Sequence, residues 1–233
     1  MQDSLEAIVP YEHQQEAENV PGIDLAANAI KMVLDVVELG HEVASANLAR
    51  DAANYGSDNK LALAGTSKWS DPNSDPAKAI KDANEQIRRK TGRYANTLAL
   101  GPDVATALKT HPKIKDNFKY TSSESITTDM LAKFFELDKV VIGKAVYLPE
   151  EAPEDALAND VWGDDAILAF VPNDTTGNFQ VPSFGYQYEL NGYPQVEQPY
   201  TERNIKSWVY PTTTERRAYL TGADAGFLFK AAV

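Results

Sequence analysis

The feature that most constrains the fold is a long stretch without proline, residues 23–55, in which apolar positions recur with helical spacing. At about 1.5 Å per residue it predicts a rod of roughly 50 Å, whereas an average helix has only about 11–12 residues. A rod with one apolar stripe packs along a sheet or another helix and keeps its opposite face in water. Its two apolar rows, each repeating every seven residues, are Ile23, Ile30, Val37 and Ala44, and Ala27, Leu34, His41 and Leu48.

The residues on either side of this rod predict an arm and a second helix. Residues 1–22 are polar and acidic, which indicates an extended arm or the end of a loop. A second helix is predicted after Asp75, which resembles an N-cap, with Pro76 in the first helical turn. Gly92 fits the position just past the C-terminal end of that helix.

The second half of the chain alternates helical and strand patterns and then becomes rich in strands. Thr97–Leu100 is an apolar strand, and it precedes a helix that opens at Gly101 and ends before Pro112. A further helix is predicted to start after Thr127 or Thr128. The later strand patterns are Val140–Leu148, Ala166–Val171, Val181–Leu190, Asn204–Tyr210, Arg217–Thr221 and Gly226–Lys230. This order of elements indicates an α+β architecture.

Composition and charge exclude several classes of function. The chain has no cysteine, which excludes disulfides, thiolate nucleophiles and sulfur-ligated metals. No apolar run approaches the roughly 20 residues that a membrane span requires, and no signal pattern opens the chain, so we expect synthesis in the cytoplasm. The net charge of −12 and the dispersed basic residues argue against tight binding of nucleic acid. An acidic wall around DNA would be compatible with that charge, because it repels phosphate.

The candidate metal ligands are weak. Glu38 and His41 lie three residues apart on the rod, as in di-iron helix bundles, but such bundles need two Glu-x-x-His motifs and further glutamates. A polar interruption at the edge of the apolar stripe explains the pair better, since neither His13 nor His111 repeats the motif. An acidic run lacks calcium-loop spacing and is better explained as a solvated loop: Glu150, Glu151, Glu154, Asp155, Asp160, Asp164 and Asp165.

No catalytic constellation emerges from the remaining residues. His111 has no serine or aspartate partner in a known motif, and a histidine at a helix C-terminus, favoured by the helix dipole, explains it better. The phosphate-loop, dinucleotide, nucleophile-elbow and zinc-protease motifs are absent from the sequence. The following aromatic side chains lack basic neighbours and are predicted to fill the core or subunit contacts: Trp69, Trp162, Trp208, Phe184, Tyr186 and Tyr188.

Four segments occur in the order and spacing of one protein family. They are WSDPNSDP at Trp69–Pro76, TGRYANTLALGPDVATALKTHPKI at Thr91–Ile114, VWGDDAILAFVP at Val161–Pro172 and PSFGYQY at Pro182–Tyr188. Together they resemble the major capsid proteins of tailed bacteriophages, and the resemblance covers most of the chain from about Val9 onward. One local departure is Ala95, where family members usually carry a proline before the asparagine.

The resemblance implies the Hong Kong 97-type capsid fold, an α+β fold with a long spine helix, a peripheral domain and an axial domain. Residues 1–22 would be the remnant of an extended loop or arm, and residues 23–55 the spine helix. The peripheral domain would be discontinuous and would comprise residues 23–75 and 175–233. The axial domain would comprise residues 76–174. Because relatives carry an arm and a long loop before the spine helix, the resemblance also implies an N-terminally shortened chain.

The implied function is structural, not enzymatic, and no catalytic, cofactor-binding or metal-ligating residue is expected. The chain would be the major capsid protein, or coat protein, of a tailed phage or prophage, and would self-assemble into pentamers and hexamers of an icosahedral shell. The shell would enclose double-stranded DNA without binding it specifically. Scaffolding, portal and decoration proteins are further expected partners, and a membrane is not. The expected location is the virion capsid, after synthesis in the cytoplasm of the bacterial host.

Two alternatives stay open at this point. An encapsulin-like compartment shares the fold but houses a cargo enzyme. A neighbouring terminase, portal or prohead protease gene would favour the phage, and an adjacent peroxidase or ferritin-like gene the compartment. A metal-dependent hydrolase that uses the acidic run would require stoichiometric metal in the purified protein.

Overall fold

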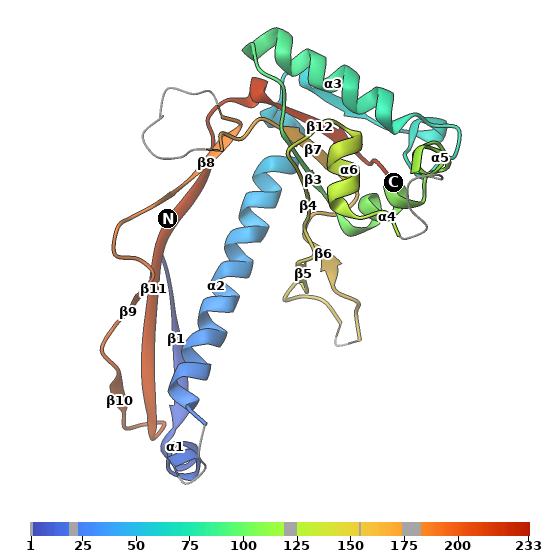
Figure 1. Cartoon of the computed structure of the whole chain (residues 1–233). Helices are drawn as coiled ribbons and strands as arrows, with labels where there is room; N and C mark the ends of the chain where they lie inside the picture. The colour runs from blue at the N-terminus through green and yellow to red at the C-terminus, as the bar shows by residue number, and fades with distance from the viewer. Residues whose placement is uncertain (1, 19–22, 119–124, 154, 174–182) are drawn as a thin grey trace. The chain divides into compact units, whose positions relative to one another are not determined.

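The chain divides into two units, and each unit combines segments that are far apart in the sequence. In the computed structural model the described residues are 2–18, 23–118, 125–153, 155–173 and 183–233 (Figure 1). The first unit comprises Met1–Ala44 and Gln187–Ala218, and the second unit comprises Ser45–Tyr186 and Tyr219–Val233.

Helix α2 (Leu25–Arg50) confirms the predicted rod, but it is shorter than residues 23–55 at both ends. It stops at Arg50 because Asp51 adopts an extended backbone and its carboxylate accepts a hydrogen bond from the Ala53 N–H at 2.9 Å. That bond opens a short 3₁₀ turn, η1 (Ala52–Asn54), in place of a further helical turn.

The buried face of α2 differs from the predicted heptad rows. Val33, Ala46 and Ala49 are its buried residues, whereas Ile23 lies before the helix and is exposed, and Ala44 is also exposed. A straight helix drifts by about 20° per heptad relative to a strict seven-residue repeat. The rows therefore rotate out of the contact face along a helix of this length.

The first unit contains a sheet built on one long strand, β11 (Ser207–Leu220). Strand β1 (Gln2–Pro10) pairs with it antiparallel along its whole length, from Gln2 opposite Glu215 to Pro10 opposite Ser207. Residues predicted to form an extended arm are therefore a paired strand followed by helix α1 (Tyr11–Glu18). The other strands that pair with β11 are β8 (Gly185–Glu189), β9 (Gln195–Val196) and β10 (Tyr200–Glu202).

The second unit contains a mixed five-stranded sheet in the order β2-β12-β7-β3-β4. The β2–β12 and β3–β4 pairs are parallel, and the β12–β7 and β7–β3 pairs are antiparallel. The strands are β2 (Lys60–Ala62), β3 (Thr97–Leu100), β4 (Lys139–Ile142), β7 (Ala166–Ala169) and β12 (Gly226–Lys230). The helices are α3 (Pro76–Thr91), α4 (Pro102–Thr110), α5 (Pro112–Phe118) and α6 (Thr128–Phe134), with 3₁₀ turns η2 (Ser57–Asn59), η3 (Gly65–Ser67) and η4 (Ala223–Ala225).

The local signals predicted for the helices of the second unit are confirmed. The Asp75 carboxylate accepts a hydrogen bond from the Lys78 N–H at 3.0 Å and caps α3, and Gly92 ends that helix with a positive φ of 74°. Helix α4 ends at Thr110, before Pro112, and Thr127 caps α6. These helix ends could be predicted from the sequence because each depends on residues within one helical turn of each other.

Three predicted strands differ in extent from those of the structure. Val140–Leu148 is divided into β4 and β5 (Val146–Tyr147), and β5 pairs separately with β6 (Asn159–Asp160). The break begins at Gly143, which lies so close to Trp162 that an added Cβ would be 1.9 Å from the indole ring. Conversely, the segments predicted at Asn204–Tyr210 and Arg217–Thr221 overlap the two ends of one strand, β11, which begins at Ser207 and ends at Leu220.

Candidate functional site

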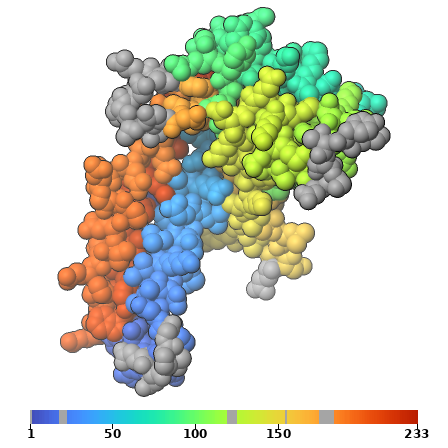
Figure 2. Space-filling model, in the orientation of Figure 1, coloured from blue at the N-terminus to red at the C-terminus, as the bar shows by residue number. Residues whose placement is uncertain are grey.

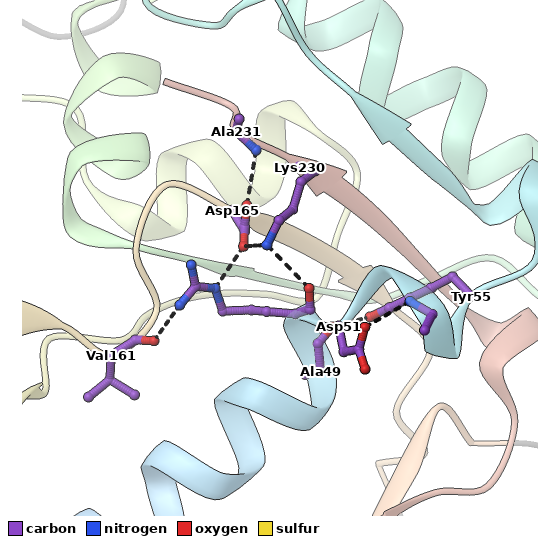
Figure 3. Close-up of polar contacts among 9 residues, drawn as sticks. Ala49, Asp51, Tyr55, Val161, Asp165, Lys230 and Ala231 are labelled. Atoms are coloured by element: carbon purple, nitrogen blue, oxygen red, sulfur yellow. Dashed lines mark hydrogen bonds and ion pairs between the residues drawn. The ribbon is translucent and has the colours of Figure 1, made fainter.

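A cluster of charged groups surrounds Asp165, whose side chain is only 3% exposed (Figure 3). The carboxylate oxygen Oδ2 accepts hydrogen bonds from Arg50 Nε at 2.7 Å and from Lys230 Nζ at 2.8 Å. The other oxygen, Oδ1, accepts one from the Ala231 N–H at 2.9 Å. We call Arg50, Asp165, Lys230 and the Ala231 N–H the Asp165 cluster.

Three elements bring this cluster together. Arg50 is the last residue of α2, Asp165 immediately precedes β7, and Lys230 is the last residue of β12. Because β12 pairs antiparallel with β7, with Phe229 opposite Ala166, the lysine lies beside the aspartate. Glycine at position 163 leaves room for the guanidinium, since a Cβ there would lie 2.5 Å from Arg50 Nη2.

Further hydrogen bonds hold the C-terminal end of α2 in the second unit. Arg50 Nη1 donates to the Val161 carbonyl at 2.8 Å, and Lys230 Nζ lies 3.4 Å from the Arg50 carbonyl. The Tyr55 hydroxyl donates to the Ala49 carbonyl at 2.6 Å (Figure 3). Orphan carbonyls at the end of a helix need such partners when they are removed from water.

The charges of the Asp165 cluster suit a structural role. Burial alone would raise the pKa of Asp165, but the hydrogen bonds from Lys230, Ala231 and Arg50 outweigh it and hold that pKa below its ordinary value. Burial, and secondarily the Asp165 charge, raises the pKa of the Tyr55 hydroxyl. The carboxylate thus stays ionised and committed to its donors, which suits positioning of α2 and not proton transfer.

The Glu-x-x-His motif on α2 suggests a metal ion as the partner of Glu38 and His41, but the partner of Glu38 in the structure is an arginine. Glu38 Oε1 forms an ion pair with Arg216 Nη1 on β11 at 2.7 Å, within the first unit. The Arg216 side chain is only 9% exposed, and its Nε and Nη2 atoms have no hydrogen-bond partner among the described residues. His41 Nε2 is also buried without a described partner. The sequence offered no signal for the Arg216 contact, because the two residues are far apart in the chain.

The other two histidines belong to different units. His111 follows the end of α4, where it was predicted to end a helix, and is buried. Its Nε2 lies 3.1 Å from Ser74 Oγ and 3.1 Å from the Asp71 carbonyl, so the ring joins α4 to the loop before α3. His13 is exposed on α1.

The predicted solvated acidic loop is wrong for Asp165, which is buried and paired as described above. Glu150, Glu151, Asp155 and Asp164 are exposed and Asp160 is half-buried, whereas Glu154 lies outside the described residues. Within the described part of the chain, no group of three or more His, Asp or Glu side chains is arranged to hold a metal ion.

The aromatic side chains divide between core and surface. Trp69 is buried against Phe229, with ring centroids 5.0 Å apart, and Phe184 stacks on Tyr55 at 5.8 Å. Trp208 contacts Tyr11 edge-on in the first unit, and these contacts agree with the predicted role in packing. Tyr188, by contrast, is 50% exposed.

Large apolar side chains remain exposed in both units. None of the described helices has the length and apolarity of a membrane span. Exposed apolar side chains that gather in patches are candidates for contacts with other protein surfaces. In the first unit they include Leu5, Ile8, Met32, Val36, Leu190, Val196 and Ile205. In the second unit they include Leu61, Val146, Tyr147, Leu148 and Leu157.

Comparisons with known proteins point to one family. The model of the family "Phage major capsid protein E" matches residues 42–201. The chain is similar to the major capsid protein of Burkholderia phage BcepMu, with 32% identity over 227 residues, which are 96% of this chain and 71% of that protein.

Solved structures resemble this one over nearly the whole chain. A phage-related protein from Bordetella bronchiseptica RB50 is 39% identical, with a TM-score of 0.89, and the match covers 100% of this chain and 76% of that one. The encapsulin of Synechococcus elongatus is only 8% identical, with a TM-score of 0.61 and coverage of 99% and 73%. At that identity the likeness concerns the fold alone.

Proposed function

The chain belongs to the phage major capsid protein E family, and we propose that its work is to self-associate into the pentamers and hexamers of an icosahedral shell around double-stranded DNA. The similarity to the BcepMu capsid protein over 96% of this chain carries the proposal, because it includes both units. The family is structural and not enzymatic, and the α+β fold is that of phage capsid proteins.

The surface chemistry of the chain supports a role in a shell. A standard protein interface buries about 1,600 Å², and the exposed apolar side chains in both units offer material for several such contacts. A shell gains strength from geometric closure and from the number of repeated contacts. The net charge of −12 suits a container whose packaged DNA is not bound specifically, because like charges repel.

The proposal also assigns the segments of the chain to the domains of a capsid subunit. Residues 76–174 would form the axial domain near the centre of a capsomer, and residues 23–75 with 175–233 the peripheral domain. Residues 1–22 would contribute to contacts with neighbouring subunits. Scaffolding, portal and decoration proteins are the further partners that assembly of a phage shell would involve, and the subunits would be made in the cytoplasm of the bacterial host.

The encapsulin-like compartment is not proposed as the function. Its likeness to this chain rests on fold, whereas the family model and a relative with 32% identity are phage capsid proteins. The gene neighbourhood gives an independent check, since terminase, portal and prohead protease genes accompany a phage capsid gene.

The experiment is to express the chain together with its neighbouring genes and to image the purified particles by electron microscopy. We expect closed shells with pentameric and hexameric capsomers, in which mass spectrometry identifies this chain as the most abundant protein. Particles that lack this chain, or the absence of any capsomer, would contradict the proposal.

A further inference from the structure

A groove in the second unit leaves apolar side chains open to water. It lies between α3 and β2, has a volume of about 350 Å³, and has an apolar lining made of Leu61, Ala79, Ala83 and Phe227. Among the described strands, β2 is an edge strand of the five-stranded sheet, and Leu61 at its centre is 44% exposed. We call this hollow the β2–α3 groove. Apolar side chains gathered in a hollow at a sheet edge indicate a surface that binds another protein segment.

The charged side chains that line the same groove are mostly acidic. Three are aspartates, at positions 58, 75 and 82, and one is Lys78. Each of the aspartate side chains is at least half exposed. Lys78 pairs with Asp82, whereas the ion pairs of Asp58 and Asp75, with lysines outside the groove lining, are 4.0 Å and 3.8 Å long. Exposed ion pairs of this kind are weak, so the groove favours an apolar group that is flanked by positive charge.

The chain itself carries a segment with that chemistry, the turn of residues 203–206 between β10 and β11. Ile205 is 50% exposed, and Arg203 and Lys206 are exposed on either side of it in the sequence. Neither cation forms an ion pair with a described residue. The segment that carries the turn, orange in Figure 2, lies at the surface of the first unit in that view. We call residues 203–206 the basic turn.

The neighbours of Ile205 distinguish it from the other exposed apolar side chains. Of the large apolar side chains that are exposed in the described part of the chain, Ile205 alone has two basic residues within two positions in the sequence. The others have one such neighbour or none. The basic turn thus presents an apolar side chain between cations, and the β2–α3 groove presents an apolar lining beside carboxylates. Opposite charges steer two such surfaces into register before contact.

We propose that the basic turn of one subunit docks in the β2–α3 groove of a neighbouring copy of this chain. Ile205 enters the apolar part of the groove, and the two cations pair with the aspartates that line it. The inference rests on the proposed function and assigns one contact between shell subunits to named surfaces. The contact joins two different surfaces of identical chains, so its repetition links successive subunits and closes a ring when the rotation permits.

Disulfide cross-linking tests the contact directly, because the chain contains no cysteine. Ile205→Cys and Leu61→Cys are made as separate full-length variants, one with a size tag, and are mixed under mild oxidation. Each chain then holds one cysteine, so a mixed dimer reports only a contact between two copies. The control mixture replaces Leu61→Cys by Leu148→Cys, because Leu148 belongs to the same unit, is 48% exposed and does not line the groove.

At low salt we expect the mixed dimer to form about tenfold faster than the control dimer, in line with the rate gain that electrostatic steering gives. The advantage should disappear in 1 M salt, because the Debye length falls from about 10 Å at 0.1 M to about 3 Å at 1 M. Equal rates in the two mixtures at low salt would overturn the proposal.

A charge swap separates this contact from simple exposure of the cysteines. Adding Arg203→Asp and Lys206→Asp to the turn variant should lower the mixed-dimer rate by about tenfold. Aspartate suits position 206, where φ is 46°, because its short polar side chain tolerates the left-handed backbone. Adding Asp58→Lys and Asp82→Lys to the groove variant should restore the rate, and failure to restore it would also overturn the proposal.

The matched control for the swap removes the same charge from two other exposed positions of the turn variant, Lys31→Glu and Lys133→Glu, and should leave the rate unchanged. Electron microscopy of the unmodified chain separates this contact from the capsid function. Normal shells with no mixed dimer would reject the contact and leave the capsid function intact. A salt-dependent mixed dimer without shells would support the contact and contradict the capsid function.

Discussion

The two units of the molecule differ in what they bury. Both clusters of buried apolar side chains in the described chain lie in the second unit, with large residues such as Trp69 and Phe229. The buried apolar residues of the first unit are small: Ala7, Val9, Val33 and Val209. Buried threonines fill much of the remainder of β11, at Thr212, Thr213 and Thr214. A unit with a thin core gains most from surfaces that other subunits supply, and we expect the first unit to depend more on assembly.

The ion pairs of the two units also differ in how completely the buried ion is hydrogen-bonded. In the second unit the buried partner is Asp165, and both of its oxygens accept hydrogen bonds. In the first unit the buried partner is Arg216, with two nitrogen atoms left without a described partner, while Glu38 is 59% exposed. A buried ion stabilises a fold only when its hydrogen bonds are made.

The largest expected effect tests the difference between the cores. Leu98→Ala removes a fully buried side chain from β3 and should lower the free energy of unfolding by about 3–5 kcal/mol. The matched control in the first unit, Leu190→Ala, removes a leucine that is 53% exposed and should change that free energy by at most about 0.5 kcal/mol. Urea unfolding followed by tryptophan fluorescence measures both, and equal losses would contradict the comparison.

The second-largest effect on the free energy of unfolding is expected for Asp165→Asn. The change leaves Arg50 and Lys230 beside a neutral amide and should lower the free energy of unfolding by about 3 kcal/mol. Asp155→Asn, at an exposed position between β5 and β6, is the control and should be close to neutral. A neutral outcome for Asp165→Asn in the same urea titrations would show that the cluster contributes nothing to the second unit.

Acid should weaken the second unit through the same carboxylate. The pKa of Asp165 is lower in the folded chain than the ordinary value of about 3.9, so its contribution is complete above that value and is lost as the pH falls through the folded pKa. We expect the stability difference between the unmodified chain and Asp165→Asn to be constant near neutral pH and to shrink below about pH 4. A difference that stays constant down to pH 2 would refute this, with unfolding followed at each pH.

The smallest effect is expected in the first unit. Arg216→Met replaces an incompletely bonded buried cation by an apolar side chain and should change the free energy of unfolding by less than about 1 kcal/mol in either direction. Arg50→Met, which takes one of two cations from Asp165, should cost more, about 2 kcal/mol. Hydrogen exchange of α2 and β11 compares the two variants, and a larger loss in Arg216→Met would reverse the ranking.

Part of the fold was predictable because its signals are local. The cap at Asp75, the left-handed Gly92 and the end of α4 each depend on residues within one helical turn. The length of α2 was overestimated because the capping hydrogen bond of Asp51 competes with helix continuation, and apolar periodicity does not register that competition.

The Asp165 cluster could not be predicted in the same way. In the sequence, Asp165 ends an acidic run and looks like its neighbours Asp160 and Asp164. Its partners, Arg50 and Lys230, become adjacent only when β12 pairs with β7 and α2 ends beside them. The same holds for β1, which pairs with β11 near the other end of the chain.

By itself the sequence determined the α+β class, the long helix, the local caps and the membership in a capsid family, because these depend on short-range patterns and on four recognisable segments. Only the tertiary structure decided which acid is buried, which cations neutralise it and which apolar side chains remain exposed for other subunits. The physical reason is that burial and ion pairing depend on the distance between residues in space. In a chain whose units each combine two separate segments of the sequence, that distance bears little relation to separation along the chain.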